Sequence, residues 1–166
     1  MHSIKDKGGE YMNFFLNNRQ IIKDLKLNTG TAGSPTYTAM CTTSEIELTT
    51  DMEIKNFYVF CDAIERSLTT GASVSLDCTV KLDINNTAIQ GLLTKIHSLL
   101  ASGEIAQFNN ETIQFDLLSG ISSSVLTYTT YTAPATLEFS DLGGAAEDEG
   151  EFSLTIHING TSTASA

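Results

Sequence analysis

Histidine and cysteine are the side chains of this sequence that could bind a metal or carry out acid–base and nucleophilic chemistry. The histidines are far apart and have no acidic or cysteine partner at ligand spacing; they are His2, His97 and His157. The cysteines are odd in number and lack a Cys-x-x-Cys spacing; they are Cys41, Cys61 and Cys78. P-loop, nucleophile-elbow and zincin patterns are absent from the sequence. We therefore predict no enzyme activity, no cofactor, and no catalytic or metal site.

Carboxylates gather near the C-terminus, in and beside a loop bracketed by Gly143 and Gly150. They are Asp141, Glu147, Asp148, Glu149 and Glu151. Their spacing differs from the alternate ligand positions of a calcium-binding EF-hand loop. The pattern favours a solvated loop that contributes to the electric field of the surface.

The charge of the chain is negative and unevenly distributed. Five of the nine basic residues lie in the first 26 positions with three acids, so residues 27–166 hold 4 basic and 17 acidic residues, a net charge of −13. Such a body repels phosphate at close range, which excludes ordinary DNA binding. The N-terminus has no apolar segment typical of a secretory signal, and no apolar run approaches the ~20 residues of a membrane span.

The elements that must position these charges are mostly strands. Strict apolar–polar alternation predicts strands over 74–84, 137–142 and 151–158, the last two forming a hairpin. Further strands are expected within 14–27, 36–40, 44–50, 57–60, 112–118 and 125–131, with an interruption at 51–56. Cys78 shares the apolar phase of its strand and is predicted to be a buried thiol.

One helix is predicted over residues 87–102. Thr87 and Gln90 match a capping box, an apolar stripe runs from Ile89 to Leu100 at helical spacing, and Gly103 supplies the stop. The fold class is therefore mainly β, an antiparallel sandwich or barrel with one flanking helix. We expect a single domain over 12–160, a flexible tail over 161–166, and an upstream extension or arm over 1–11, with Met12 as an alternative start.

The chain resembles the major tail tube proteins of long-tailed bacteriophages. The likeness rests on the stretch 51–63, on the strand 74–84 with the helix that follows it, and on 137–153. It implies a tail-tube-like β-sandwich whose homohexameric rings stack into a hollow tube that conducts DNA into the host. The implied partners are further copies, the tape measure protein inside the tube, and tail-tip, initiator and terminator proteins. DNA would pass through the tube without tight binding, and no membrane would be a partner. The protein would be located in a virion tail that is assembled in the host cytoplasm.

The resemblance also suggests which residues make contacts. Residues 51–56 are similar to the family's long loop that reaches the adjacent ring, which makes Asp51, Glu53 and Lys55 candidates for inter-ring contacts. Lys23 and Lys26, in the basic N-terminal segment, are candidates for contacts with an acidic neighbour. The acidic loop residues become a candidate lumen or ring-contact surface. Alternation alone leaves open which sheet face lines the lumen, because side chains facing the core and side chains facing the lumen both recur at every second residue.

Two other interpretations compete with this one. A tube component of a contractile injection system would share the fold and be enclosed by a sheath. A carbohydrate- or receptor-binding β-sandwich usually exposes aromatic rings for stacking, whereas this chain lacks Trp and clusters only Tyr128 and Tyr131.

Overall fold

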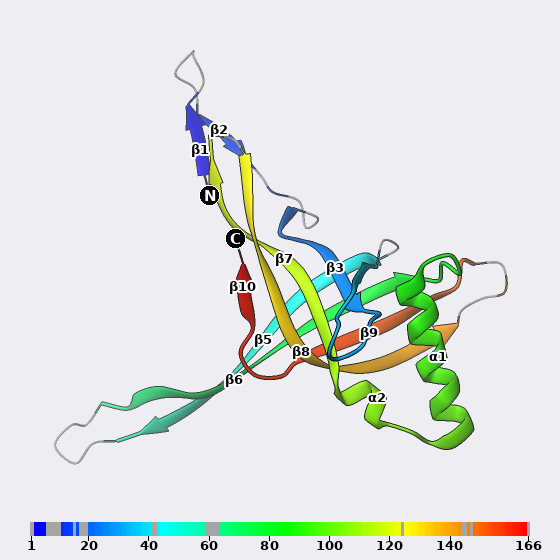
Figure 1. The fold of residues 1–166 in the computed structure, drawn as a ribbon. Coiled ribbons are helices and arrows are strands. Elements are labelled where there is room, and N and C mark those ends of the chain that lie inside the picture. Colours follow the sequence, from blue (N-terminus) through cyan, green and yellow to red (C-terminus); the bar gives the residue numbers. More distant parts are fainter. Residues whose placement is uncertain are drawn as a thin grey trace.

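The computed structural model describes residues 2–5, 11–14, 16, 20–40, 43–58, 64–123, 125–143, 146 and 148–165. The protein is mainly β, as predicted, with one long helix (Figure 1). The strands are β1 His2–Lys5, β2 Tyr11–Phe14, β3 Ile22–Asn28, β4 Tyr37–Ala39, β5 Thr43–Phe57, β6 Arg66–Lys81, β7 Glu111–Ser122, β8 Val125–Gly143, β9 Glu151–Ile158 and β10 Thr163–Ser165. The helices are α1 Thr87–Ser102 and α2 Ala106–Asn109.

One antiparallel sheet contains most of the strands, in the order β4-β3-β7-β8-β9-β6-β5. The predicted hairpin is present, because β8 pairs with β9 from Ala135 opposite Ile158 onward. The division of the chain at residues 11 and 160 stays a prediction, but strands pair across both positions. β1 pairs with β2, and β10, in the segment expected to be a flexible tail, pairs with Thr130–Thr132 of β8.

The hydrophobic core lies on one face of this curved sheet. Its largest fully buried side chains come from β6, β7, β9 and α1: Leu76, Val80, Ile113, Phe152, Leu154, Ile156, Ile89 and Leu92. The alternation that predicted these strands is therefore the alternation between core and surface. Cys78 is buried in β6 as predicted, and burial, with a smaller contribution from Asp77, raises the pKa of its thiol to about 12.

The predicted interruption at residues 51–56 is wrong. β5 runs without a break from Thr43 to Phe57 and pairs with β6 along its whole length, with a bulge between Glu53 and Ile54. The outer part of this pair projects beyond the sheet as a two-stranded arm (Figure 1). We call the paired residues 50–57 and 66–74 the arm. Charged and apolar residues alternate from Asp51 to Lys55, and this two-residue period is that of a continuing strand.

The N-terminus of α1 is capped by a different residue from the one predicted. Asn86, not Thr87, is the N-cap, and its side-chain oxygen accepts hydrogen bonds from the backbone N–H of Ala88 at 2.9 Å and of Ile89 at 3.3 Å. Gln90 donates to the carbonyl of Ile84, in the turn after β6. Gly103 ends the helix with φ 67°, in the left-handed conformation predicted for it.

Substitution of Asn86 by alanine is expected to lower the free energy of unfolding by about 1–2 kcal/mol. The variant loses the cap and the hydrogen bond from Asn86 Nδ2 to the Ala39 carbonyl, which ties α1 to β4. Thr87→Ala is the matched control, since Thr87 is exposed and does not cap the helix. Urea unfolding followed by circular dichroism measures both. Equal losses of unfolding free energy in the two variants would contradict Asn86 as the cap and favour Thr87.

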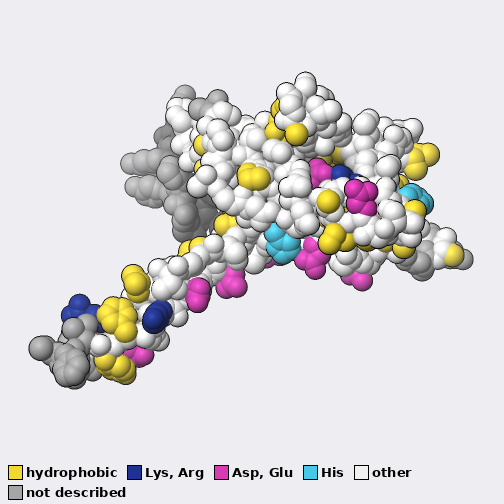
Figure 2. Space-filling model, turned by 60° about the horizontal axis from the view of Figure 1, so that its bottom comes forward, with side chains coloured by type: hydrophobic (Ala, Val, Ile, Leu, Met, Phe, Trp, Pro, Cys, Tyr) yellow, Lys and Arg dark blue, Asp and Glu magenta, His cyan; other side chains and the backbone are white. Residues whose placement is uncertain are grey.

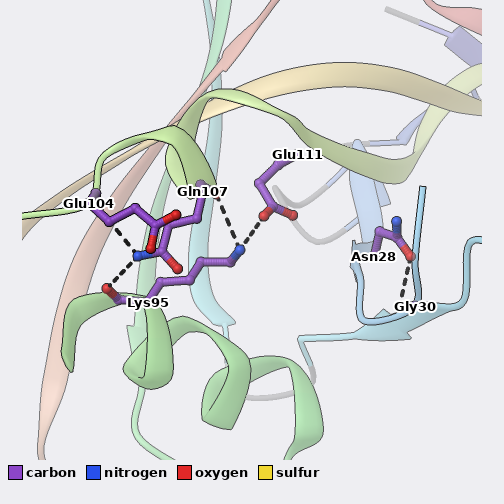
Figure 3. A network of polar contacts seen from close by, with 6 residues as sticks. All are labelled: Asn28, Gly30, Lys95, Glu104, Gln107 and Glu111. Atoms are coloured by element: carbon purple, nitrogen blue, oxygen red, sulfur yellow. Dashed lines mark hydrogen bonds and ion pairs between the residues drawn. The ribbon is translucent and has the colours of Figure 1, made fainter. Parts of the chain in front are cut away.

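A half-buried ion pair fastens α1 to the start of β7. The Lys95 ammonium group contacts the Glu111 carboxylate and donates to the Gln107 carbonyl at 3.2 Å, while Gln107 Nε2 donates back to the Lys95 carbonyl (Figure 3). The two charged side chains are only 22% and 11% exposed. The reciprocal pairing thus joins α1 to α2, and the ion pair joins α1 to β7.

Glu111→Gln is expected to destabilise the fold by about 1–2 kcal/mol, because it leaves the half-buried Lys95 without its charge-assisted hydrogen bond. The matched control is Glu149→Gln, which breaks the exposed ion pair with Lys81 and is expected to change stability by no measurable amount. Urea unfolding at neutral pH compares the two. A control variant as unstable as Glu111→Gln would contradict the argument from burial.

Candidate functional site

The face of β5, β6, β9 and β8 opposite the core is polar and acidic. Strand register places its side chains in rows across the four strands. Its carboxylates, by alternation, are Glu45, Glu47, Asp51, Glu53, Asp77, Glu138 and Glu151. Acidic side chains run from the body onto the arm, with a histidine among them (Figure 2). We call this surface the acidic face.

The middle row of the acidic face concentrates negative charge. Glu47 lies directly opposite Asp77, which is opposite Thr155, which in turn is opposite Glu138. Asp77 accepts hydrogen bonds from the hydroxyls of Thr49 at 3.0 Å and Thr155 at 2.7 Å. Like charges opposite one another destabilise a sheet, so this row costs stability that hydroxyl donors only partly offset. The sequence analysis missed the row, because only the register between distant strands reveals it.

His157 is the histidine of this surface. Its Nε2 lies 2.8 Å from Glu138 Oε2, and both side chains are exposed. His157 occupies the polar phase of β9, as predicted. The pair is too exposed for strong stabilisation, and it neutralises one carboxylate of the acidic face only when the imidazole is protonated.

The candidates for inter-ring contacts lie together on the arm. Asp51, Glu53 and Lys55 are exposed and share one face of β5, the outward continuation of the acidic face. The opposite phase of β5 carries Met52 and Ile54, which are 59% and 60% exposed. Within the arm, β5 therefore presents a charged row on one face and an apolar row on the other.

The two lysine candidates lie on β3, away from the arm. Lys23 Nζ is 3.9 Å from the centroid of the Tyr128 ring, and Lys26 is half-buried opposite Gln114 of β7. Lys23 thus makes a cation–π contact inside its own chain. Its role between subunits stays a prediction, and reversing its charge would also disturb this internal contact.

The acidic loop lies at the end of the sheet away from the arm tip. Glu151 is opposite Lys81 at the end of β6, whereas the arm tip begins at Arg66, the other end of that strand. Glu149 pairs with Lys81, a contact that raises the pKa of the lysine and lowers that of the carboxylate. Asp141 and Asp148 are exposed, and Glu147 lies outside the described residues. The inter-ring candidates on the arm and the acidic-loop residues therefore lie at opposite ends of the subunit.

Two kinds of feature are absent from the described residues: a metal-binding cluster and a helix able to span a membrane. Within them, no group of three or more His, Cys, Asp or Glu side chains is placed to hold a metal ion. Among the described residues, neither helix is long and apolar enough to cross a membrane.

No protein-family model matches this sequence. No curated protein matches it significantly either.

Solved structures of tail particles share the fold. A chain in the tail of an empty gene transfer agent particle, refined with helical C6 symmetry, aligns with 92% of this chain and 100% of its own length at a TM-score of 0.59 and 13% identity. A chain of the native gene transfer agent virion gives a TM-score of 0.55 at 11% identity, covering 92% and 100%. A chain of the six-fold symmetrised anti-feeding prophage baseplate gives 0.54 at 14% identity, covering 93% and 98%. These likenesses concern the fold, and the predicted fold class, mainly β with a flanking helix, is confirmed.

Proposed function

We propose that this chain is a structural subunit of a phage-like tail tube, in which six copies form a ring and rings stack around a channel for DNA. The observation that carries the proposal is the fold match, which spans nearly the whole of both chains in a tail of C6 symmetry. Residues 12–160 would form the tube domain, and the N-terminal segment and residues 161–166 would be terminal extensions that contact neighbouring copies. This role needs no catalysis, cofactor or metal.

The acidic face supports the assignment of a channel surface. The core occupies the other face of the same strands, so the acidic face is the one available to line a lumen. A carboxylate-rich wall repels the DNA backbone and keeps it from binding, whereas each cationic phosphate contact would release counterions and hold the DNA in place. The row of like charges, which costs the subunit stability, fits a surface selected for repulsion.

The remaining partners follow from the same role. A tape measure protein would occupy the channel before DNA does, and tail-tip, initiator and terminator proteins would bound the tube. The protein would be found in the virion tail after assembly in the host cytoplasm.

A second candidate is the inner tube of a contractile injection system. The likeness to a chain of the anti-feeding prophage baseplate favours it, because that particle gives almost the same TM-score as the gene transfer agent virion. The two candidates differ in whether a sheath surrounds the tube. Co-purification of a sheath protein with particles from the natural source would select the contractile candidate.

The test is to concentrate the purified full-length protein and examine it by negative-stain electron microscopy and native mass spectrometry. Hollow tubes or six-membered rings are expected. A persistent monomer, even when seeded with the tail-tip complex of the natural particle, would overturn the proposal and favour a β-sandwich binding module.

A further inference from the structure

A groove of about 1040 Å³ opens between β3 and the outer edge of β5. In the part of the chain that the structure describes, β5 pairs only with β6, and β4 covers β3 only from Lys26 onward. The sheet is thus left unclosed along this seam. The groove is bounded by the edge backbone of both strands, which favours an occupant that adds its own extended backbone.

The lining of the groove is apolar inside and acidic at the rim. Its apolar lining includes Ile22, Leu25, Ile46, Leu48 and Leu117, from β3, β5 and β7. Ile22 and Leu25 are buried, and the other three pack partly buried against the core. The exposed carboxylates of Asp24, Glu45 and Glu47 stand at its edge. An occupant with apolar side chains and positive charge would complement this surface.

The outer half of the arm has these properties. Met52, Ile54 and Leu68 are 59%, 60% and 57% exposed, and Phe57 is 40% exposed. Apolar groups therefore lie on both of its faces, since Ile54 and Leu68 occupy opposite phases of the ladder. Lys55, opposite Leu68, and Arg66, opposite Phe57, supply cations (Figure 2). Apolar surface of this extent on a two-stranded projection marks an interaction site.

The arm cannot reach the groove of its own chain. Both are built on β5: the groove uses Thr43–Leu48 and the outer arm begins at Met52. Ile46 and Ile54 are eight residues apart on one continuous strand, or roughly 27 Å at about 3.4 Å per residue. The occupant must then be a second copy, and the contact joins two different surfaces. Such a heterologous contact repeats head to tail and generates a closed ring or an open stack, depending on the rotation between copies.

We propose that the outer arm of one copy, residues 52–57 and 66–72, binds in the β3–β5 groove of the next copy. Its apolar side chains would lie against Ile22, Ile46 and Leu48, and Lys55 would lie toward the Glu45 and Glu47 carboxylates. The inference deepens the proposed function, on which it rests for the assembly of copies of this chain. It identifies the surface that receives the arm.

Disulfide trapping tests this contact between copies. The background is Cys41→Ser/Cys61→Ser, in which the remaining Cys78 is buried and unreactive. A ¹⁵N-labelled Lys55→Cys protein is mixed with an unlabelled Glu47→Cys protein, concentrated and oxidised, because the proposed contact places these two side chains together. The matched control mixture replaces the second partner by Glu104→Cys, an exposed site in the loop between α1 and α2. Mass spectrometry counts the mixed disulfides, and electron microscopy of the same samples records rings and tubes.

Severalfold more mixed disulfide with Glu47→Cys than with Glu104→Cys is the expected result. Equal yields in the two mixtures would overturn the inference, whether tubes are present or not. If tubes form but the two disulfide yields are equal, the proposed function stands and only this contact is wrong. If the disulfide forms selectively but no rings or tubes appear, the contact stands and the proposed tube function is wrong. Predominant linkage of Glu47→Cys to residues 1–20, mapped in a third mixture with single cysteines there, would assign the groove to the N-terminal segment and contradict the proposal.

Discussion

A variant in which residues 51–73 are replaced by an Asn-Gly turn is expected to fold and to lose assembly. The excision joins Thr50 to Val74, which already face each other across the ladder, through a turn that suits a two-residue hairpin. Among the removed residues that the structure describes, none belongs to the hydrophobic core, so the free energy of unfolding should fall little. Assembly should fail because the exposed apolar side chains of the arm are the surface on which copies would join.

Circular dichroism and urea unfolding check the fold of the excised variant, and light scattering with electron microscopy checks assembly. The matched control keeps the arm and changes only three of its exposed apolar side chains, by Met52→Thr, Ile54→Thr and Leu68→Thr. Threonine preserves strand propensity, so this variant should keep the hairpin and still fail to assemble. Tubes from either variant, in amounts equal to the native protein, would contradict a role for the arm.

The elements that sequence reasoning locates correctly are those with unbroken local periodicity. β9 and the second half of β6, from Val74 to Val80, alternate strictly because one face is buried there, and α1 combines a 3.6-residue stripe with a glycine stop at Gly103. The stripe overstates the burial of the helix, since Leu99 and Leu100 are 38% and 79% exposed. Packing reaches only the N-terminal half of α1, and no local pattern reports that.

The continuity of β5 is the principal difference between sequence and structure. The alternation of Asp51, Glu53 and Lys55 with Met52 and Ile54 is the signal that could have found it. High charge density suggests a break, although a strand that leaves the body has no buried face and tolerates charge at every second position. A similar ambiguity misplaces the helix cap, because Asn86 and Thr87 both favour that position and only backbone geometry distinguishes them.

The acidic face lies beyond sequence reasoning for a different reason. Glu47, Asp77 and Glu138 are 30 to 91 residues apart, and they form a row only because β6 pairs with both β5 and β9, and β9 with β8. Pairing order and register are long-range properties. The composition predicts an acidic body, but the placement of charge on one sheet face requires the structure.

Reversal of two charges on the acidic face is expected to convert a non-binding channel into one that retains DNA. In Glu138→Lys/Glu151→Lys, lysines replace two carboxylates of the acidic face that lie outside the β3–β5 groove. Stability should change little, because both sites are exposed: the His157 contact is lost, and the lysine introduced at position 151 lies opposite Lys81, a like-charge pair that costs about 0.2–1 kcal/mol. A change in DNA binding would therefore report the surface charge and not a damaged fold.

The measurement is co-sedimentation of a short fluorescent DNA duplex with assembled tubes over a range of salt concentrations. Native tubes should leave the duplex in solution, while the variant should retain it at low salt and release it as salt rises, with a log–log slope of about −0.9 per phosphate contacted. Thr94→Lys/Ala101→Lys/Glu104→Lys is the control, since it changes the net charge equally at exposed sites on and next to α1, on the core side of the sheet. Because one lumen surface repeats six times around a ring, a reversal there concentrates positive charge on the DNA path, whereas the control spreads it elsewhere. Equal retention by both variants would mean that net charge alone governs binding and that the acidic face does not line the channel.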